Sequence, residues 1–220
     1  MKTYKFDPHT HTAESSNCSA ITAIELVEGY HAAGFSGIAI TDHLADYCMF
    51  QYKDWDACID RLMRGYNAAK KRGDELGLDV ILGVEVRFDE SFCDYLIYCV
   101  DEAFLRKNPY LYRLGLRKFF RRFKDKLLVI QAHPYRGTGS PDINFMHGVE
   151  VHNGNPRHKN RNNKTRELCE KHPGLYQLSA SDTHLPEDIG TGWLEFDEPV
   201  ADSRRFRRLV MGGGYEIGRA

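Results

Sequence analysis

Residues 7–12, Asp7-Pro8-His9-Thr10-His11-Thr12, come directly after a short apolar segment at residues 4–6. In a β-strand, residues i and i+2 point to the same face, so His9 and His11 at the end of a strand can bind one cation. An HxH pair alone is weak support for a metal site, because imidazole is also an ordinary polar side chain. The pair gains weight because histidines and carboxylates follow short apolar runs along the rest of the chain.

Seven side chains of this kind lie at the ends of predicted strands. The apolar run at residues 37–41 is typical of a strand that is buried on both faces, and strands are also predicted at residues 79–84, 127–132 and 176–180. The candidate metal ligands are His9, His11, His43, Glu85, His133, Asp182 and His184. Further strands are predicted at residues 95–100, 148–151 and 193–196. Helical periodicity predicts helices near residues 22–33, 54–76, 104–126, 157–172 and 202–211.

The alternation of strands and helices favours an α/β fold with a parallel sheet, either open or closed. An open sheet gathers its ligands at one crevice, whereas a barrel brings the ends of all its strands to one mouth. Contributions from six or seven strands therefore favour a (β/α)7 barrel with the metal site at the C-terminal mouth of the strands. No linker or repeat divides the chain, so we expect a single domain over residues 1–220.

Composition narrows the environment and the partners. The formal net charge is −1, so the molecule as a whole does not attract nucleic acid. The six cysteines show no CxxC spacing, which is typical of reduced thiols in a cytosolic protein. No run of about 18 apolar residues occurs, so we expect a cytoplasmic protein without a membrane partner.

The chemistry of the candidate ligands predicts more than one cation. Nitrogen and oxygen donors suit Zn²⁺, Mn²⁺ or Fe²⁺. Seven groups exceed the needs of one ion, so we expect two or three divalent transition metals, with Glu85 as the bridging carboxylate. Such a cluster turns a bridging water into hydroxide at neutral pH and holds both oxygens of an in-line displacement. Hydrolysis of a phosphate ester is the reaction that this chemistry predicts.

Five motifs occur in the order found in one protein family. They are His9-Thr-His11-Thr12, Thr41-Asp42-His43, Gly83-Val-Glu85, Ala132-His133-Pro134 and Ser181-Asp182-Thr-His184. With them the chain resembles, over about residues 3–195, the polymerase and histidinol phosphatase (PHP) family of metal-dependent phosphoesterases. The resemblance implies a distorted seven-stranded barrel with a trinuclear metal site at its mouth. Members mostly hydrolyse small phosphomonoesters.

The resemblance also implies how the ligands are shared. The first metal would be held by His9, His11, Glu85 and Asp182. Glu85 would bridge to a second metal that His133 also holds, and the third would be held by His43 and His184.

Two positions depart from the family pattern. Ser16 and Asn17 stand where the family often has a histidine or aspartate for the third metal, and Asn17 is a weaker, neutral ligand. No histidine lies between His43 and His133 to complete the second site, and either Asp94 or Asp101 is a substitute. The barrel argument favours Asp101, whereas the spacing in some branches of the family favours Asp94.

Other residues are candidates for substrate binding and catalysis. Arg136 and Arg87 can each fork onto a phosphate, and His152 ends a predicted strand near Glu150 and Asn153, which are candidates for orienting ligands. We expect Glu85, His43 and His184 to be catalytic, the two histidines assisting the leaving alcohol through the third metal or as a general acid.

Two alternative functions stay open. An amidohydrolase-type enzyme also begins with HxH on a barrel strand, but that family typically carries a bridging lysine, and no lysine lies at a predicted strand end. A nucleic-acid-associated module with phosphodiesterase or exonuclease action would use the basic segment at residues 113–126. The net charge near zero favours instead an outer helix with its cations in water.

Overall fold

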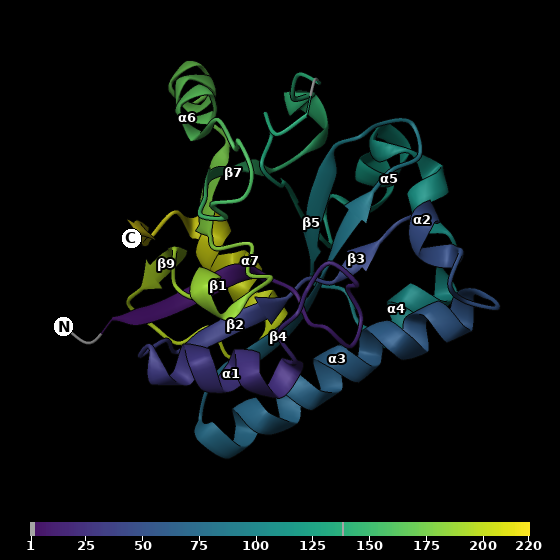
Figure 1. Cartoon of the computed structure of the whole chain (residues 1–220). Coiled ribbons are helices and arrows are strands. Elements are labelled where there is room, and N and C mark those ends of the chain that lie inside the picture. The colour runs from purple at the N-terminus through teal and green to yellow at the C-terminus, as the bar shows by residue number, and fades with distance from the viewer. Residues whose placement is uncertain (1–2, 138) are drawn as a thin grey trace.

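The computed structural model of the chain describes residues 3–137 and 139–220. Its strands form one curved sheet in the order β10-β9-β1-β2-β4-β5-β6-β7-β8, with β3 paired to β4 (Figure 1). The strands are β1 (Tyr4–Thr10), β2 (Gly37–Ile40), β3 (His43–Leu44), β4 (Asp79–Arg87), β5 (Asp94–Tyr98), β6 (Leu128–Gln131), β7 (Gly148–Asn153), β8 (Tyr176–Ala180), β9 (Gly192–Phe196) and β10 (Tyr215–Arg219).

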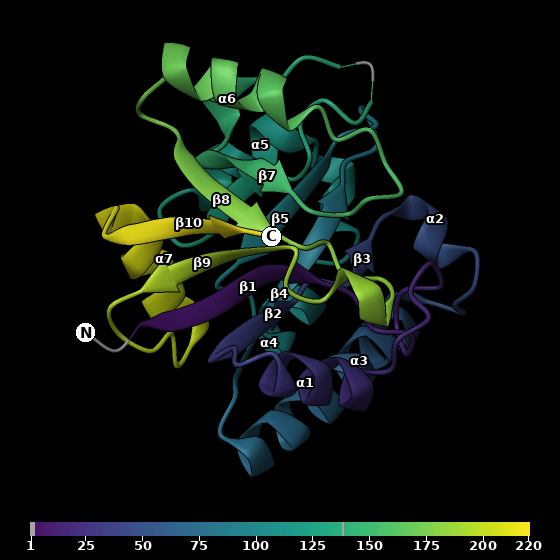
Figure 2. The same cartoon turned by 60° about the vertical axis from the view of Figure 1, so that its left-hand side comes forward.

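The sheet curls until the end of β8 meets β1, as Figure 2 shows. Thr10 and Thr183 form a parallel bridge, and the backbone N–H of His11 donates to the carbonyl of Thr183 at 3.1 Å. The N–H of Ser181 donates to the Asp7 carboxylate at 3.2 Å. These contacts nearly close the sheet into a barrel, which confirms the predicted fold class.

One strand of the barrel runs against the predicted direction. β5 is antiparallel to both β4 and β6, so Arg87 lies opposite Asp94 and Gly83 lies opposite Tyr98. A strand of a uniformly parallel barrel would bring its last residue to the mouth. Here the first residue of β5, Asp94, lies at the mouth, because it stands beside the late part of β4.

The helices lie mainly outside this sheet, with α1 and α3 packed side by side (Figure 1). They are α1 (Ala23–Ala32), α2 (Asp46–Met49), α3 (Trp55–Leu76), α4 (Glu102–Lys107), α5 (Leu116–Phe123), α6 (Asn162–Lys171) and α7 (Ser203–Gly212). A capping box of Thr22 and Glu25 begins α1, and Asp54 caps α3. None of the described helices is long and apolar enough to cross a membrane.

Three segments differ from their predicted structure. The segment 104–126 is divided into α4, a 3₁₀ turn η1 (Leu111–Leu114) and α5, because Pro109 and the left-handed Gly115 (φ 74°) interrupt it. α6 begins at Asn162, later than the predicted start at residue 157. The chain after the triple glycine is also ordered and forms β10 against β9.

α7 closes the end of the barrel that lies opposite the mouth. Phe206 is fully buried, with its ring centroid 5.1 Å from Phe6 of β1 and 4.8 Å from Tyr98 of β5. Phe6 lies three residues before His9, and Tyr98 ends the reversed strand that begins at the mouth. Apolar packing therefore fills one end of the barrel and leaves the polar side chains together at the other.

Candidate metal centre

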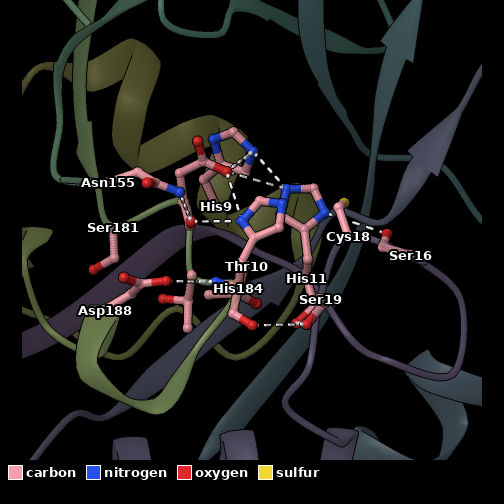
Figure 3. A network of polar contacts seen from close by, with 12 residues as sticks. His9, Thr10, His11, Ser16, Cys18, Ser19, Asn155, Ser181, His184 and Asp188 are labelled. Carbon is pink, nitrogen blue, oxygen red and sulfur yellow. Dashed lines mark hydrogen bonds and ion pairs between the residues drawn. The ribbon is translucent and has the colours of Figure 1, made fainter. Parts of the chain in front are cut away.

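The end of β1 brings two imidazoles and two carboxylates together. The Nε2 atoms of His9 and His11 lie 3.0 Å apart (Figure 3). Oδ1 of Asp182 lies 3.4 Å from Nε2 of His9 and 3.3 Å from Nε2 of His11. The Glu85 carboxylate approaches each Nε2 at 3.6 Å. Donor atoms around one tetrahedral Zn²⁺ lie about 3.4 Å apart, given Zn–N bonds of about 2.1 Å. These four buried side chains therefore fit the first predicted cation site.

A second group consists of Glu85, Asp94 and His133. Nε2 of His133 lies 3.0 Å from Oε1 of Glu85 and 4.0 Å from Oδ2 of Asp94. Asp101 does not join this group: its carboxylate accepts from the N–H of Phe104 at 2.7 Å and caps α4. The barrel argument for Asp101 is wrong because β5 is reversed, so Asp94, and not Asp101, lies at the mouth.

A third group consists of His11, His43 and His184. The short strand β3, which the sequence did not predict, pairs His43 directly with Glu85. Nδ1 of His43 lies 2.7 Å from Oε2 of Glu85. The three groups thus overlap, since Glu85 contacts members of each of them.

The loop after the HxH motif is held by a residue that was not among the predicted site residues. The buried Asp42 accepts a hydrogen bond from Ser16 Oγ at 2.7 Å. Asn17, the predicted third-site residue, is exposed and its amide is engaged elsewhere: it donates to Gln51 at 2.8 Å and accepts from Arg61 at 3.4 Å. The structure therefore does not bring Asn17 into the cluster.

Glu85 provides the strongest sign that the centre is built for cations. Its side chain is buried, and Oε2 accepts no hydrogen bond, since the 2.7 Å contact with His43 does not have hydrogen-bond geometry. Burial alone would raise the pKa of Glu85, but the charges of His43 and His9 outweigh it and hold the pKa well below its usual range. A buried carboxylate oxygen without a donor is expensive unless a cation lies beside it.

The surroundings of His9 and His11 shift the pKa values of the two imidazoles in opposite directions. Burial lowers the pKa of His9, but the carboxylates of Asp182 and Glu150 outweigh it and raise that pKa well above its usual value. Burial and the neighbouring charges of His184 and His43 lower the pKa of His11. Imidazoles this close together repel one another when protonated, and a shared cation would remove that conflict. The donor set of nitrogen and oxygen atoms fits Zn²⁺, Mn²⁺ or Fe²⁺.

Glu150 holds two of the candidate ligands in place. Its Oε1 lies 2.9 Å from Nδ1 of His9, and its Oε2 accepts from the backbone N–H of His133 at 2.7 Å. The amide of Asn153 donates to Oε2 as well, at 2.8 Å. These contacts agree with the ligand-orienting role that the sequence indicated for Glu150 and Asn153. The sequence signal for Glu150 was a carboxylate between two valines in a buried strand.

Two ligand positions carry unusual backbone conformations. His133 (φ 29°) and Asp182 (φ 55°) both lie in the left-handed region, which is unfavourable for residues other than glycine. Each follows a buried strand, β6 or β8, and the sharp turn aims its side chain into the mouth. Such local strain is common at functional sites.

Asp188 supports the turn that carries His184. Its carboxylate accepts hydrogen bonds from the backbone N–H groups of His184 and Leu185, and the sequence did not predict this turn.

The mouth opens into a pocket of about 390 Å³ that the predicted arginines help to line. Arg136 donates to Oδ2 of Asp182 at 2.6 Å and to Asn153 at 3.0 Å. Arg87 forms a bidentate pair with Asp94, with both distances 2.7 Å. Both arginines therefore support candidate ligands in addition to facing the pocket.

His152 lies away from this pocket. Its Nε2 lies 3.2 Å from the carbonyl of Thr191, and its Nδ1 lies 3.1 Å from the amide of Asn162. A bulge in the pairing of β7 with β8 occurs between Glu150 and His152. The structure thus does not bring His152 to the substrate position that we predicted.

Sequence comparison identifies the fold and the motifs as those of a known family. The sequence profile of the PHP domain matches residues 7–206. The chain belongs to the PHP domain family. Comparison with curated protein sequences gives no match.

Solved structures share this PHP fold at low sequence identity. A two-domain protein from Bacteroides vulgatus, which contains a predicted PHP-like metal-dependent phosphoesterase, aligns with TM-score 0.72 at 17% identity over 99% of this chain and 65% of its own. This chain therefore spans about two thirds of that protein's length. A candidate metal-dependent phosphoesterase from Bifidobacterium adolescentis aligns with TM-score 0.57 at 17% identity, over 93% of this chain and 95% of its own.

A third similar structure is an amidohydrolase from Chromobacterium violaceum with bound sulfate and no metal. It aligns with TM-score 0.56 at 17% identity, over 97% of this chain and 97% of its own. These likenesses show that the barrel is shared among proteins with different named activities.

Proposed function

We propose that this PHP domain hydrolyses a small-molecule phosphomonoester with the help of two or three divalent ions, Zn²⁺, Mn²⁺ or Fe²⁺. The observation that carries the proposal is the overlap of three ligand groups around Glu85 at the floor of a pocket with two arginines. The pocket volume, about 390 Å³, lies at the lower end of the range for small-molecule sites. Bound divalent ions would supply a water of lowered pKa and neutralise the charge of the ester oxygens.

The residues of the chain have separate tasks in this proposal. Arg136 uses Nε and Nη2 on Asn160, Asn153 and Asp182, while its Nη1 makes no hydrogen bond to a described residue. Nη1 is therefore the donor that we assign to a phosphate oxygen, with the rest of the guanidinium held in advance. Arg87 is assigned the weaker substrate role, because both of its charged contacts go to Asp94.

The leaving alcohol needs a proton, and His184 or His43 is assigned to supply it. Burial lowers the pKa of His184, but its bond to Cys18 and the charge of Asp182 raise it above the ordinary value. A protonated His184 can act as general acid. A ring nitrogen that binds a cation cannot also donate a proton, so occupancy of the third group would shift this task to water.

Replacing Glu85 by glutamine tests the proposal. Phosphate release should be measured on chelator-stripped protein that is restored with Mn²⁺, Fe²⁺ or Zn²⁺, over a panel of phosphomonoesters and phosphodiesters. We expect metal-dependent turnover of a monoester by the wild type, loss of that turnover in Glu85→Gln, and no loss in the exposed control Glu170→Gln. A Glu85→Gln variant that keeps most of the wild-type activity would contradict the proposal that Glu85 bridges two ions.

The two alternative functions have less support in the structure. No lysine is among the described residues that line the pocket, so the bridging lysine expected of an amidohydrolase has no counterpart there. The basic segment is partly neutralised, since Arg113 pairs with Asp46 and Arg117 with Asp142. We expect DNA binding to be weak and unchanged when Arg117 and Lys118 are replaced by glutamine. A clear, salt-dependent loss of binding would favour the nucleic-acid function.

A further inference from the structure

The loop after the HxH motif brings a thiol to the third histidine group. Sγ of Cys18 lies 3.2 Å from Nε2 of His43, and His184 lines the same pocket close enough to lower the pKa of this thiol. Cys18 lines the pocket beside its neighbour Asn17, but the amide of Asn17 is engaged by the side chains of Gln51 and Arg61. Sulfur thus lies beside His43, one residue after the position where the family often has a histidine or aspartate ligand.

Each of the two histidines has its Nδ1 beside an oxygen atom. Nδ1 of His184 lies 2.8 Å from the backbone carbonyl of Asp182, which can only accept, so Nδ1 carries a proton and, in the neutral ring, Nε2 keeps its lone pair. Nδ1 of His43 faces the Glu85 carboxylate at 2.7 Å, and its Nε2 faces Cys18. Metal-binding histidines commonly have their second ring nitrogen held by an oxygen, as the Asp182 carbonyl holds Nδ1 of His184.

We propose that the thiolate of Cys18 joins His43 and His184 as the third protein ligand of one cation. The inference rests on the metal centre of the proposed function and not on any particular reaction. Ligand atoms with Zn–S of about 2.3 Å and Zn–N of about 2.1 Å lie about 3.6 Å apart in a tetrahedral site. The observed separation of 3.2 Å between Sγ and Nε2 is close to that value. The buried, undonated Oε2 of Glu85 adds a negative atom beside His43.

The proposed ligand set has a chemical consequence. When the cation binds, the S–H bond of Cys18 breaks, a sulfur–metal bond forms, and the proton leaves to the solvent. One thiolate and two imidazoles form a softer set than the groups around Asp94 and Asp182, which combine imidazoles with carboxylates. Softer ligands select Zn²⁺ or Fe²⁺ over Mn²⁺ or Mg²⁺. The third group should therefore fill with a different metal preference from the first two.

Cobalt substitution tests the proposal without measuring activity. Chelator-stripped protein is titrated with Co²⁺, whose bonds to thiolate give a charge-transfer absorption in the near ultraviolet. We expect this band in the wild type and in the control Cys99→Ser. Cys18→Ser should lose the band and should bind roughly one equivalent of metal less than the wild type. Cys99 is a suitable control because its Sγ donates to the carbonyl of Ser203 near the opposite end of the barrel.

A second measurement uses only the wild-type chain, in case Cys18→Ser does not fold. The rate of alkylation of Cys18 by iodoacetamide is followed by peptide mass spectrometry with and without Zn²⁺. We expect bound Zn²⁺ to slow this reaction by roughly tenfold or more, because coordination masks the nucleophilic sulfur. Equal rates, or cobalt-loaded wild type without a thiolate band, would overturn the proposal. A protein with the band but without phosphate release would reject only the hydrolase function.

Discussion

Replacing Glu150 by glutamine should weaken cation binding at the first site while the barrel stays folded. Glu150 contacts Nδ1 of His9 through Oε1 and accepts from His133 and Asn153 through Oε2. An ionised carboxylate can only accept, so it holds the proton of His9 on Nδ1. Nε2 of His9 then keeps its lone pair toward Asp182 and His11, where the cation is expected.

A glutamine of the same shape cannot satisfy all three donors. If its oxygen faces His133 and Asn153, its NH₂ group faces Nδ1 of His9, and the ring proton moves to Nε2, which should bind the cation. If its oxygen faces His9, the NH₂ group faces two N–H donors instead. Loss of such a supporting carboxylate typically lowers metal affinity about 10–100-fold. That range corresponds to about 1.4–2.7 kcal/mol of binding free energy.

The assay is a competition titration of metal-free protein with Zn²⁺ against a chromophoric chelator. The wild type, Glu150→Gln and the control Glu170→Gln, an exposed glutamate on α6, are compared at one pH, and circular dichroism checks the fold. We expect the dissociation constant of the tightest site to rise about 10–100-fold in Glu150→Gln only. A folded Glu150→Gln variant whose affinity stays within about twofold of wild type would refute the positioning role of this carboxylate.

Three further variants test other parts of the structure. Phe206→Ala should lower the free energy of unfolding by about 3–5 kcal/mol, because it leaves a cavity at the closed end of the barrel. A loss of less than about 1 kcal/mol, measured by urea titration, would contradict that packing. Burial, opposed by bonds from Ser181 and Tyr30, raises the pKa of Asp7 from 3.8 to about 7. The folded state then holds a proton that the unfolded state releases, so metal-free protein should lose up to about 4 kcal/mol as the pH rises from about 4 through 7. The stability of Asp7→Asn should not fall over this pH range. A stability difference between wild type and Asp7→Asn that stays constant with pH would argue against the raised pKa of Asp7. Arg87→Met should free Asp94 and reduce the metal retained at the second site after gel filtration, and unchanged metal content would show that the pair is only structural.

The barrel and most of the first site could be predicted because their signals are local. An apolar strand followed by His9 and His11, or by Asp182 and His184, places the ligands by the geometry of one strand. The direction of β5 could not be predicted, because residues 95–98 are all apolar and fit either direction. The choice between Asp94 and Asp101 depended on that direction alone.

Contacts between distant loops could not be predicted from sequence patterns. Cys18 lies on a loop without regular structure, and its approach to His43 depends on how Ser16 binds Asp42. β3 is only two residues long, too short for a periodic signal, although it sets His43 opposite Glu85. His152 seemed equivalent to other strand-end histidines, and the bulge in β7 that turns it away is a property of strand pairing.

The reversal of β5 also determines which part of the chain can change without disturbing the barrel. Because β4 and β5 are antiparallel neighbours, a hairpin connection of residues 88–93 joins them at the mouth. Phe92, with 86% of its surface exposed, lies on this connection, and Arg87 and Asp94 stand at its two ends. Hairpin connections accept insertions more readily than the strands that they join. Lengthening this hairpin would change the surroundings of Arg87 and Asp94, which line the pocket, while both strands stay in register, so the pocket can change here independently of the barrel.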